Sequence, residues 1–232
     1  MRKILERVAG LGMAWTAAWV LAALWPAEAA AQPKELPATV ATLAGASEVF
    51  AKGADKWAPA KLRTELREGD GARTLVAGRL VLRTGNGHAL RLAQLTQVFL
   101  AGNDLGAADQ PLRVRLDGGW LWVAVTPGTA PRAKAEVRAG PVTVAVRGTG
   151  AGIRINRDGS VLVRVYHGLA GCSGPEERKD WEREVKEGEE LLVPGTAAPG
   201  PVRKLTREAT EASWLKWNEE QDATGYGGPP PR

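Results

Sequence analysis

The stretch that decides the fold runs from Val142 to Val165 and reads VTVAVRGTGAGIRINRDGSVLVRV. Valine or isoleucine occupies alternate positions in both halves, which is typical of strands with one side on a core and the other toward solvent. Between the halves, Asn156-Arg157-Asp158-Gly159 is a turn sequence whose glycine can adopt a positive φ. We therefore predict a β-hairpin whose two strands flank this turn.

Alternating runs of the same kind recur through the chain, for example Leu112-Arg113-Val114-Arg115-Leu116. Glycine-rich turn sequences separate them roughly every 10–20 residues, which favours an all-β fold over alternating strands and helices. No exact repeat is present, so the sequence leaves open a twisted two-sheet sandwich or a short β-solenoid. The inward positions are predicted to be Leu112, Val114, Leu116, Val144, Val146, Ile153, Val163 and Val165.

The N-terminus has the three parts of a secretory signal peptide. Arg2, Lys3 and Arg7 supply positive charge, an apolar run spans Leu11 to Trp25, and small residues follow. We predict a signal peptide over residues 1–31, cleaved between Ala31 and Gln32, and hence a periplasmic or secreted protein. The alternative is an inner-membrane anchor, because residues 8–27 are uncharged and could just span a bilayer.

The remainder divides into a linker at residues 32–39, a β domain at 40–193, a linker rich in Pro and Gly at 194–203, a helix at 204–222 and a disordered tail at 223–232. Thr206 is predicted to cap the helix, and Trp214 and Trp217 fall on one helix face. A helix of this length is marginal alone in water, so we expect it to dock on its own domain.

No pattern of residues indicates catalysis. Without residues 1–31, the chain keeps 28 basic and 24 acidic residues, a balance too mild to indicate nucleic acid binding. Cys172 is the one cysteine and is predicted to be a loop thiol in the charged segment 171–184, while His88 and His167 are far apart and without metal-ligand spacing. We therefore predict no enzyme, and no catalytic, cofactor-binding or metal-binding residues.

Arginines and tryptophans are the remaining candidates for binding. Five arginines on strands are predicted to form an outward strand face rather than a site for a polyanion; they are Arg79, Arg83, Arg91, Arg113 and Arg115. The run Trp120-Leu121-Trp122-Val123-Ala124-Val125 is apolar on both faces, which predicts a strand buried on both sides.

The order of the motifs resembles the FecR (ferric-citrate regulator) periplasmic domain over residues 40–193. The matching positions are Gly45, Trp57, Leu66, Gly69-Asp70, Arg73-Thr74, Thr96, Val98, Leu100, Gly118 to Trp122, Val146 to Thr149, Asp158-Gly159, Gly168 and Glu187 to Glu189. Two positions depart from the family pattern. Ala139-Gly140-Pro141 stands where Thr-Pro is usual, and Gly150-Ala151-Gly152 stands where the family usually has an aromatic residue.

The resemblance implies a twisted, solenoid-like pair of β-sheets. In signalling members of the family this domain is the periplasmic half of a transmembrane anti-sigma regulator and contacts a TonB-dependent outer-membrane receptor. Because only about ten residues precede the apolar segment of this chain, we expect the periplasmic module without the cytoplasmic anti-sigma part.

Two functions are consistent with these features. The first is a binding or scaffolding module with an envelope protein as partner, which predicts buried Trp120 and Trp122. The second is a module that binds an anionic glycan or lipid A, which predicts Trp57 or Trp120 beside arginine in an open groove. The oligomeric state stays open.

Overall fold

The computed structural model describes residues 37–85, 88–101, 111–125, 135–175, 181–195 and 198–223, which all lie in the unit Glu35–Arg232. The predicted signal peptide, its cleavage point and most of the predicted tail lie outside these residues. Within the described residues, no helix is both long and apolar enough to cross a membrane.

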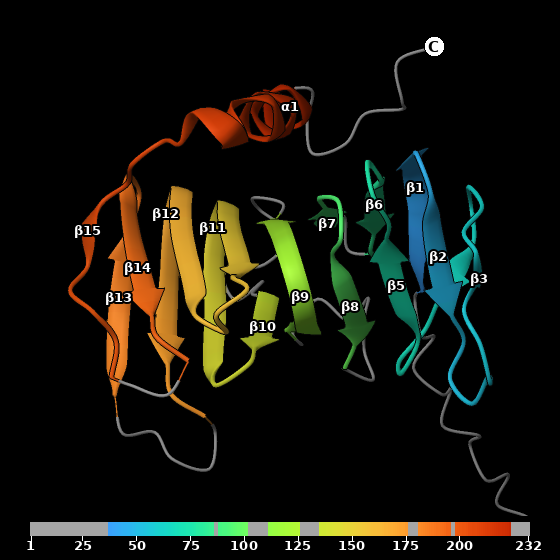
Figure 1. Ribbon diagram of the computed structural model, residues 1–232, viewed down its shortest axis with the longest axis horizontal. Coiled ribbons are helices and arrows are strands. Elements are labelled where there is room, and N and C mark those ends of the chain that lie inside the picture. Colours follow the sequence, from blue (N-terminus) through green and yellow to red (C-terminus); the bar gives the residue numbers. More distant parts are fainter. Residues whose placement is uncertain are drawn as a thin grey trace, which may run out of the picture. The chain divides into compact units, whose positions relative to one another are not determined.

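The described part is almost entirely β, as predicted (Figure 1). The elements in chain order are β1 (Ala38–Ala44), β2 (Ser47–Phe50), β3 (Ala58–Pro59), β4 (Glu65–Leu66), β5 (Gly71–Thr74), β6 (Arg79–Arg83), β7 (Ala89–Leu92), β8 (Gln97–Leu100), β9 (Leu112–Ala124), β10 (Ala135–Ala139), β11 (Val142–Ile155), β12 (Val161–Ser173), β13 (Glu182–Lys186), β14 (Glu189–Val193), β15 (Arg203–Lys204), a 3₁₀ turn (Ala209–Glu211) and α1 (Ala212–Ala223).

The strands form two layers, which we call sheet A and sheet B. Sheet A has the order β4-β1-β6-β7-β9-β11-β12-β14-β15, and sheet B has the order β3-β2-β5-β8-β9-β10-β11-β12-β13. Strands β9, β11 and β12 belong to both layers, so the hydrogen bonding is continuous from one sheet into the other. The fold therefore has features of both predicted architectures: two packed sheets, as in a sandwich, and strands that pass from one sheet to the other, as in a short solenoid.

Strand β9 shows how one strand serves both sheets. Residues 112–116 pair with β10 in sheet B, and residues 119–123 pair with β11 in sheet A. The change occurs at Gly118-Gly119, where Gly119 has φ +85° and a Cβ would lie 2.4 Å from the Thr96 hydroxyl. A side chain at this position would therefore be both strained and blocked.

The main core lies between the two sheets and consists of the inward residues of alternating strands. All eight predicted core residues are buried. The predicted hairpin is also confirmed, because Ile155 pairs with Val161 and the Asn156 amide donates to the Ser160 carbonyl at 2.8 Å. Period-two alternation was thus sufficient to identify both features.

The segment from Gly171 to Glu184 corrects the sequence prediction of a charged loop. Strand β12 continues through Gly171 and Cys172 to Ser173, and β13 begins at Glu182. Cys172 is 1% exposed and packs in the core between the sheets. The alternation was hard to recognise because small residues occupy both faces here.

The helix also begins later than the sequence predicts. Arg203 and Lys204 are in β15, and the Leu205 amide donates to the Gly188 carbonyl, so the chain stays extended up to residue 208. The 3₁₀ turn then begins at Ala209 after Glu208, and no side chain caps it. The prediction that Thr206 caps the helix was therefore wrong.

Candidate binding surfaces

The outer face of sheet A is covered by the C-terminal helix. Trp122 is fully buried and stacks on Tyr166 of β12, with ring centroids 4.5 Å apart. Trp214 of α1 packs edge-on against Trp120 at 5.9 Å and stacks with Trp217 at 5.2 Å. The expected docking of the helix on its own domain is confirmed. Of the run predicted to be buried on both sides, residues 121–125 are buried, whereas Trp120 is half-buried.

The glycines of β11 make room for these aromatic rings. A Cβ on Gly152 would lie 2.9 Å from Nε1 of Trp120 and 3.3 Å from the Tyr166 ring, and a Cβ on Gly150 would lie 3.2 Å from Trp122. These glycines stand where the family usually has an aromatic residue. Aromatic side chains of the neighbouring strands β9 and β12 fill the space above them instead.

A buried cluster of ion pairs joins the helix to sheet A. Glu211 is 3% exposed and pairs with both Arg154 of β11 and Arg164 of β12. Arg164 is 4% exposed and also contacts Glu190 of β14 at 3.0 Å and Glu208 at 3.2 Å. Burial disfavours the charged guanidinium, but the attraction of Glu211 and Glu190 outweighs it and raises the pKa of Arg164.

Arg91 forms a second polar contact with the helix. This side chain is fully buried, and its Nη1 donates to the Asn218 carbonyl at 3.1 Å. Asn218 is also buried, and its amide donates to the Trp214 carbonyl at 2.8 Å. The helix therefore presents polar groups as well as apolar ones to sheet A.

The five predicted arginines do not form one face. Arg79, Arg83 and Arg91 lie on strands of sheet A, whereas Arg113 and Arg115 lie in the part of β9 that belongs to sheet B. The sequence could not show this division because β9 changes sheet in its middle. Nor were Arg154, Arg164 and Glu211 identified from the sequence as functional residues. The two arginines could have been noticed, because each interrupts an apolar run on the side of a hairpin strand that faces away from the core.

On sheet B, one end of the outer face carries an aromatic cluster. Phe50, Trp57 and Phe99 are half-buried, with centroids 5.4 to 6.2 Å apart. The Arg73 guanidinium lies 4.4 Å from the Trp57 ring centroid and that of Arg115 lies 4.5 Å from the Phe99 centroid. Both are cation–π contacts at a partly exposed surface.

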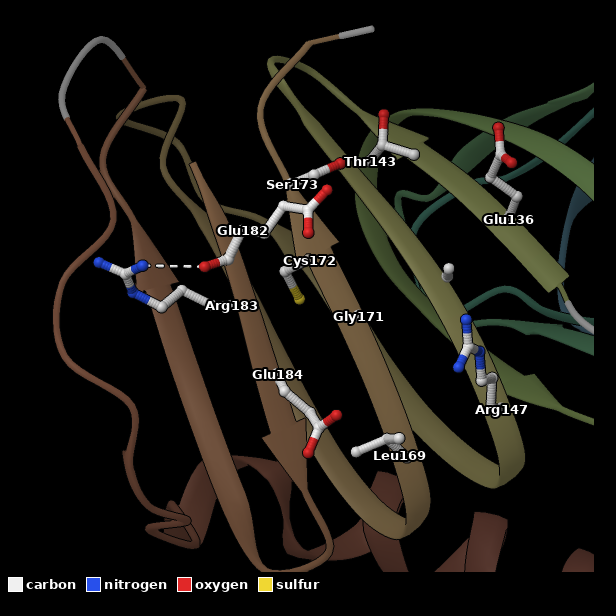
Figure 2. Close-up of a pocket in the computed structure, with 11 residues that line it drawn as sticks. Glu136, Thr143, Arg147, Leu169, Gly171, Cys172, Ser173, Glu182, Arg183 and Glu184 are labelled. Carbon is white, nitrogen blue, oxygen red and sulfur yellow. Dashed lines mark hydrogen bonds between the residues drawn. The ribbon is translucent and has the colours of Figure 1, made fainter. Parts of the chain in front are cut away.

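The other end of sheet B carries a groove of about 540 Å³ (Figure 2). It is lined by Glu136, Thr143, Ala145, Arg147, Leu169, Gly171, Cys172, Ser173, Glu182, Arg183 and Glu184. Small residues, Ala145, Gly171 and Ser173, form the floor of the groove. The space above Gly171 is open, because a Cβ on it would meet nothing within 4 Å. The groove therefore offers carboxylates, hydroxyls and guanidiniums but no aromatic ring.

The remaining sequence candidates lie apart from one another. Burial lowers the pKa of His88, which is on sheet A, while His167 is exposed and lies 3.9 Å from Glu187. Cys172 lines the groove, but its thiol is buried, and this burial raises its pKa to about 12. Among the described residues, no group of three or more His, Cys, Asp or Glu could hold a metal ion.

Comparison with known proteins gives a family model and similar crystal structures. No curated protein matches the sequence. Two crystal structures of a protein from Parabacteroides distasonis ATCC 8503, described as a "putative anti-sigma factor", are similar at 17% identity with a TM-score of 0.49. The match covers 62% of this chain, which spans 63% and 64% of the two crystallised chains.

The family model described as "FecR protein" matches residues 70–171. This range runs from the turn before β5 to the second half of β12 and therefore includes the strands that cross between the sheets. It also contains the glycines and aromatic residues of the helix-covered face, apart from those of the helix itself. The predicted resemblance to FecR domains is thus confirmed over residues 70–171.

Proposed function

We propose that this chain is an exported, non-enzymatic module of the cell envelope that binds another protein in signalling or envelope assembly. The observation that carries the proposal is the contrast between the two outer faces of its FecR domain. Its own helix covers sheet A, whereas sheet B presents aromatic rings and arginines on a rigid β scaffold. Full burial of Trp122 agrees with the protein-binding hypothesis, whereas Trp120 is only half-buried beneath the helix.

The aromatic cluster of sheet B has the composition of a protein interface. Aromatic residues and arginine are enriched in such interfaces, and tryptophan and arginine often dominate their binding energy. Trp57 and Phe99 are half-buried in the free chain, so a partner could bury more of each ring without rearrangement of the sheet. Arg73 is held by Glu48, which positions its guanidinium over Trp57.

The test is capture of partners from an envelope extract by the mature chain, with chemical cross-linking. We expect Trp57→Ala combined with Phe99→Ala to lose the captured protein. Lys216→Ala, at an exposed position of α1, is the matched control and should retain it. If the double variant is folded by circular dichroism and captures the same proteins as the wild type, the aromatic cluster is not the binding surface.

A glycan or lipid A is the second candidate ligand, favoured by the Arg73 guanidinium 4.4 Å from the Trp57 ring centroid. A sugar ring can stack on tryptophan while arginine contacts an anionic substituent. Titration of the mature chain with lipid A vesicles and envelope glycans, followed by tryptophan fluorescence, tests this alternative. A saturable change that Trp57→Ala abolishes would favour it over a protein partner.

Export is tested separately. N-terminal sequencing of the protein recovered from the envelope should begin at Gln32. Recovery of intact Met1 in the membrane fraction would support the anchored alternative instead.

A further inference from the structure

We propose that the outer face of sheet A is a second binding surface, which recognises an acidic, tryptophan-bearing helix of a partner protein. The chain's own C-terminal helix occupies this surface when the partner is absent. The inference rests on the proposed function in taking the partner to be a protein, but it concerns the opposite face of the domain.

The surface beneath the helix is basic and aromatic. Trp120, Trp122 and Tyr166 form its centre. Four arginines surround them, namely Arg79 on β6, Arg91 on β7, Arg154 on β11 and Arg164 on β12. From the sheet itself, Glu190 pairs with Arg164. The remaining carboxylates that pair with Arg154 and Arg164 come from the helix segment, so an occupant must carry acidic groups.

The resident helix shows the pattern that the surface accepts. Glu208, Glu211, Trp214 and Trp217 are spaced three residues apart. Glu211 lies between two arginines, Trp214 packs on Trp120, and the Arg79 guanidinium lies 5.9 Å from the Trp214 ring centroid. A partner helix with two carboxylates followed by a tryptophan at these intervals would make the same contacts.

The resident helix does not satisfy the surface completely. The indole N–H groups of Trp122 and Trp214 are buried without a hydrogen-bond acceptor among the described residues. Burial of a donor without an acceptor destabilises the docked state. A partner that supplies an acceptor to the Trp122 indole would bind the same surface with an additional hydrogen bond, and its binding would also release the Trp214 indole to solvent.

The resident helix depends on its contacts with the sheet for its stability. Helix α1 has 12 residues, which is too short to be stable in water by itself. The preceding residues 206–208 are exposed, and no side chain caps the 3₁₀ turn. A change in backbone conformation at residues 206–208 would therefore let the helix leave the sheet while the strands stay in place.

The experiment uses the full mature chain and a fluorescent peptide with the sequence of residues 206–223. The peptide can bind only to molecules whose own helix is undocked, so its apparent affinity scales with the undocked fraction. Glu211→Gln in the protein weakens the resident helix and leaves sheet A intact. We expect this variant to bind the peptide at least about tenfold more tightly than the wild type.

Three controls separate the surface from general loosening. Glu220→Gln, at an exposed helix position, should bind the peptide like the wild type. Adding Arg164→Met to the Glu211→Gln protein should abolish binding, as should Glu211→Gln in the peptide. If circular dichroism shows that Glu211→Gln prevents folding of the protein, Trp214→Phe weakens a different contact of the same helix, with Trp120, and should give the same gain.

Three results would overturn the inference. The first is equal peptide affinity of the folded wild type and the folded Glu211→Gln or Trp214→Phe protein. The second is a stable dimer of the mature chain that exchanges helices, because the occupant would then be a second copy. The third comes from the envelope capture. The peptide should also displace a partner bound to sheet A from the envelope capture. Capture that persists under saturating peptide would leave the proposed function intact and contradict only this inference.

Discussion

The two outer faces of this domain are built from the same residue types but have different environments. On sheet A, arginine–glutamate pairs are buried under the helix, and the space above Gly152 is filled by tryptophan and tyrosine rings. On sheet B, the Arg113–Glu136 pair is partly exposed, with side chains 54% and 35% accessible, and the space above Gly171 is open. The covering helix, and not the sheet sequence alone, therefore determines what each residue contributes to stability.

The contrast has an energetic consequence. Exposed ion pairs contribute little because water screens them, whereas removal of one partner from a buried pair leaves an uncompensated charge. We therefore expect equivalent substitutions on the two faces to have unequal effects.

Removal of the helix should have the largest effect. Truncation after Thr206 exposes Trp120, Trp122 and Tyr166 and loses the burial of Trp214 and Leu215, each worth on the order of 2–3 kcal/mol. The melting temperature should fall by about 10 °C or more. Truncation after Ala223 is the control and should leave it unchanged, because it keeps all of α1. Equal melting of the two truncated proteins would show that the helix does not stabilise sheet A.

Arg164→Met should have the next largest effect. It leaves the buried Glu211 with one arginine partner, and breaking a buried pair costs about 3 kcal/mol. Arg147→Met on the rim of the groove is the matched change on sheet B, where Arg147 is exposed, and should cost less than about 0.5 kcal/mol. Urea unfolding measures both values. Similar losses in the two variants would contradict the difference between the faces.

A pair of glycine substitutions sharpens the comparison further. Gly152→Ala pushes a methyl group against Trp120 and Tyr166 and should cost about 1–3 kcal/mol. Gly171→Ala meets open space in an extended strand and should be neutral or stabilise the domain by up to about 1 kcal/mol. Thermal unfolding of the two variants gives opposite shifts if sheet A is closed and sheet B is open.

Substitution of Cys172 tests whether its side chain lies in the core between the two sheets. The sequence predicts a loop thiol, and replacement of such a thiol by serine would have no effect on stability. Because the thiol is in the core, Cys172→Ser should instead cost about 1–2 kcal/mol by burying a hydroxyl group. The native thiol should also react with a maleimide reagent only on unfolding. Rapid labelling of the folded protein would instead show that the Cys172 thiol is exposed on the surface of sheet B.

The sequence predicts the strands and core of this domain better than it predicts the binding surfaces. Strict alternation, as in Leu112 to Leu116, identifies strands and core positions because each such residue reports its own face. The Gly171 to Ser173 segment lacked large residues and was therefore assigned to a loop. The division of the arginines depended on Gly118-Gly119, a change of sheet within one strand that local sequence does not specify.

The helix contacts were only partly accessible from sequence. Trp214 and Trp217 indicated a docking face, because two exposed tryptophans on a short helix would be unfavourable. The pairing of Glu211 with Arg154 and Arg164 joins positions about fifty residues apart in the chain. Such a contact follows from the strand order of sheet A, which the sequence did not reveal.

The smallest expected effect concerns Tyr166 and appears only at alkaline pH. Burial beneath the helix raises the pKa of its phenol from 10 to about 12, although Arg164 partly offsets the shift. The folded state therefore keeps this proton between pH 10 and 12 while the unfolded state loses it, so the stability contribution is complete below pH 10 and is lost as the pH rises toward 12.

Tyr166→Phe should match the wild type at pH 8 and be more stable by about 1 kcal/mol at pH 11. The buried Cys172 thiol, whose pKa is also about 12, affects both proteins equally and cancels from the difference. Urea unfolding at the two pH values measures it, and an equal loss in both proteins would mean that the helix does not exclude water from Tyr166.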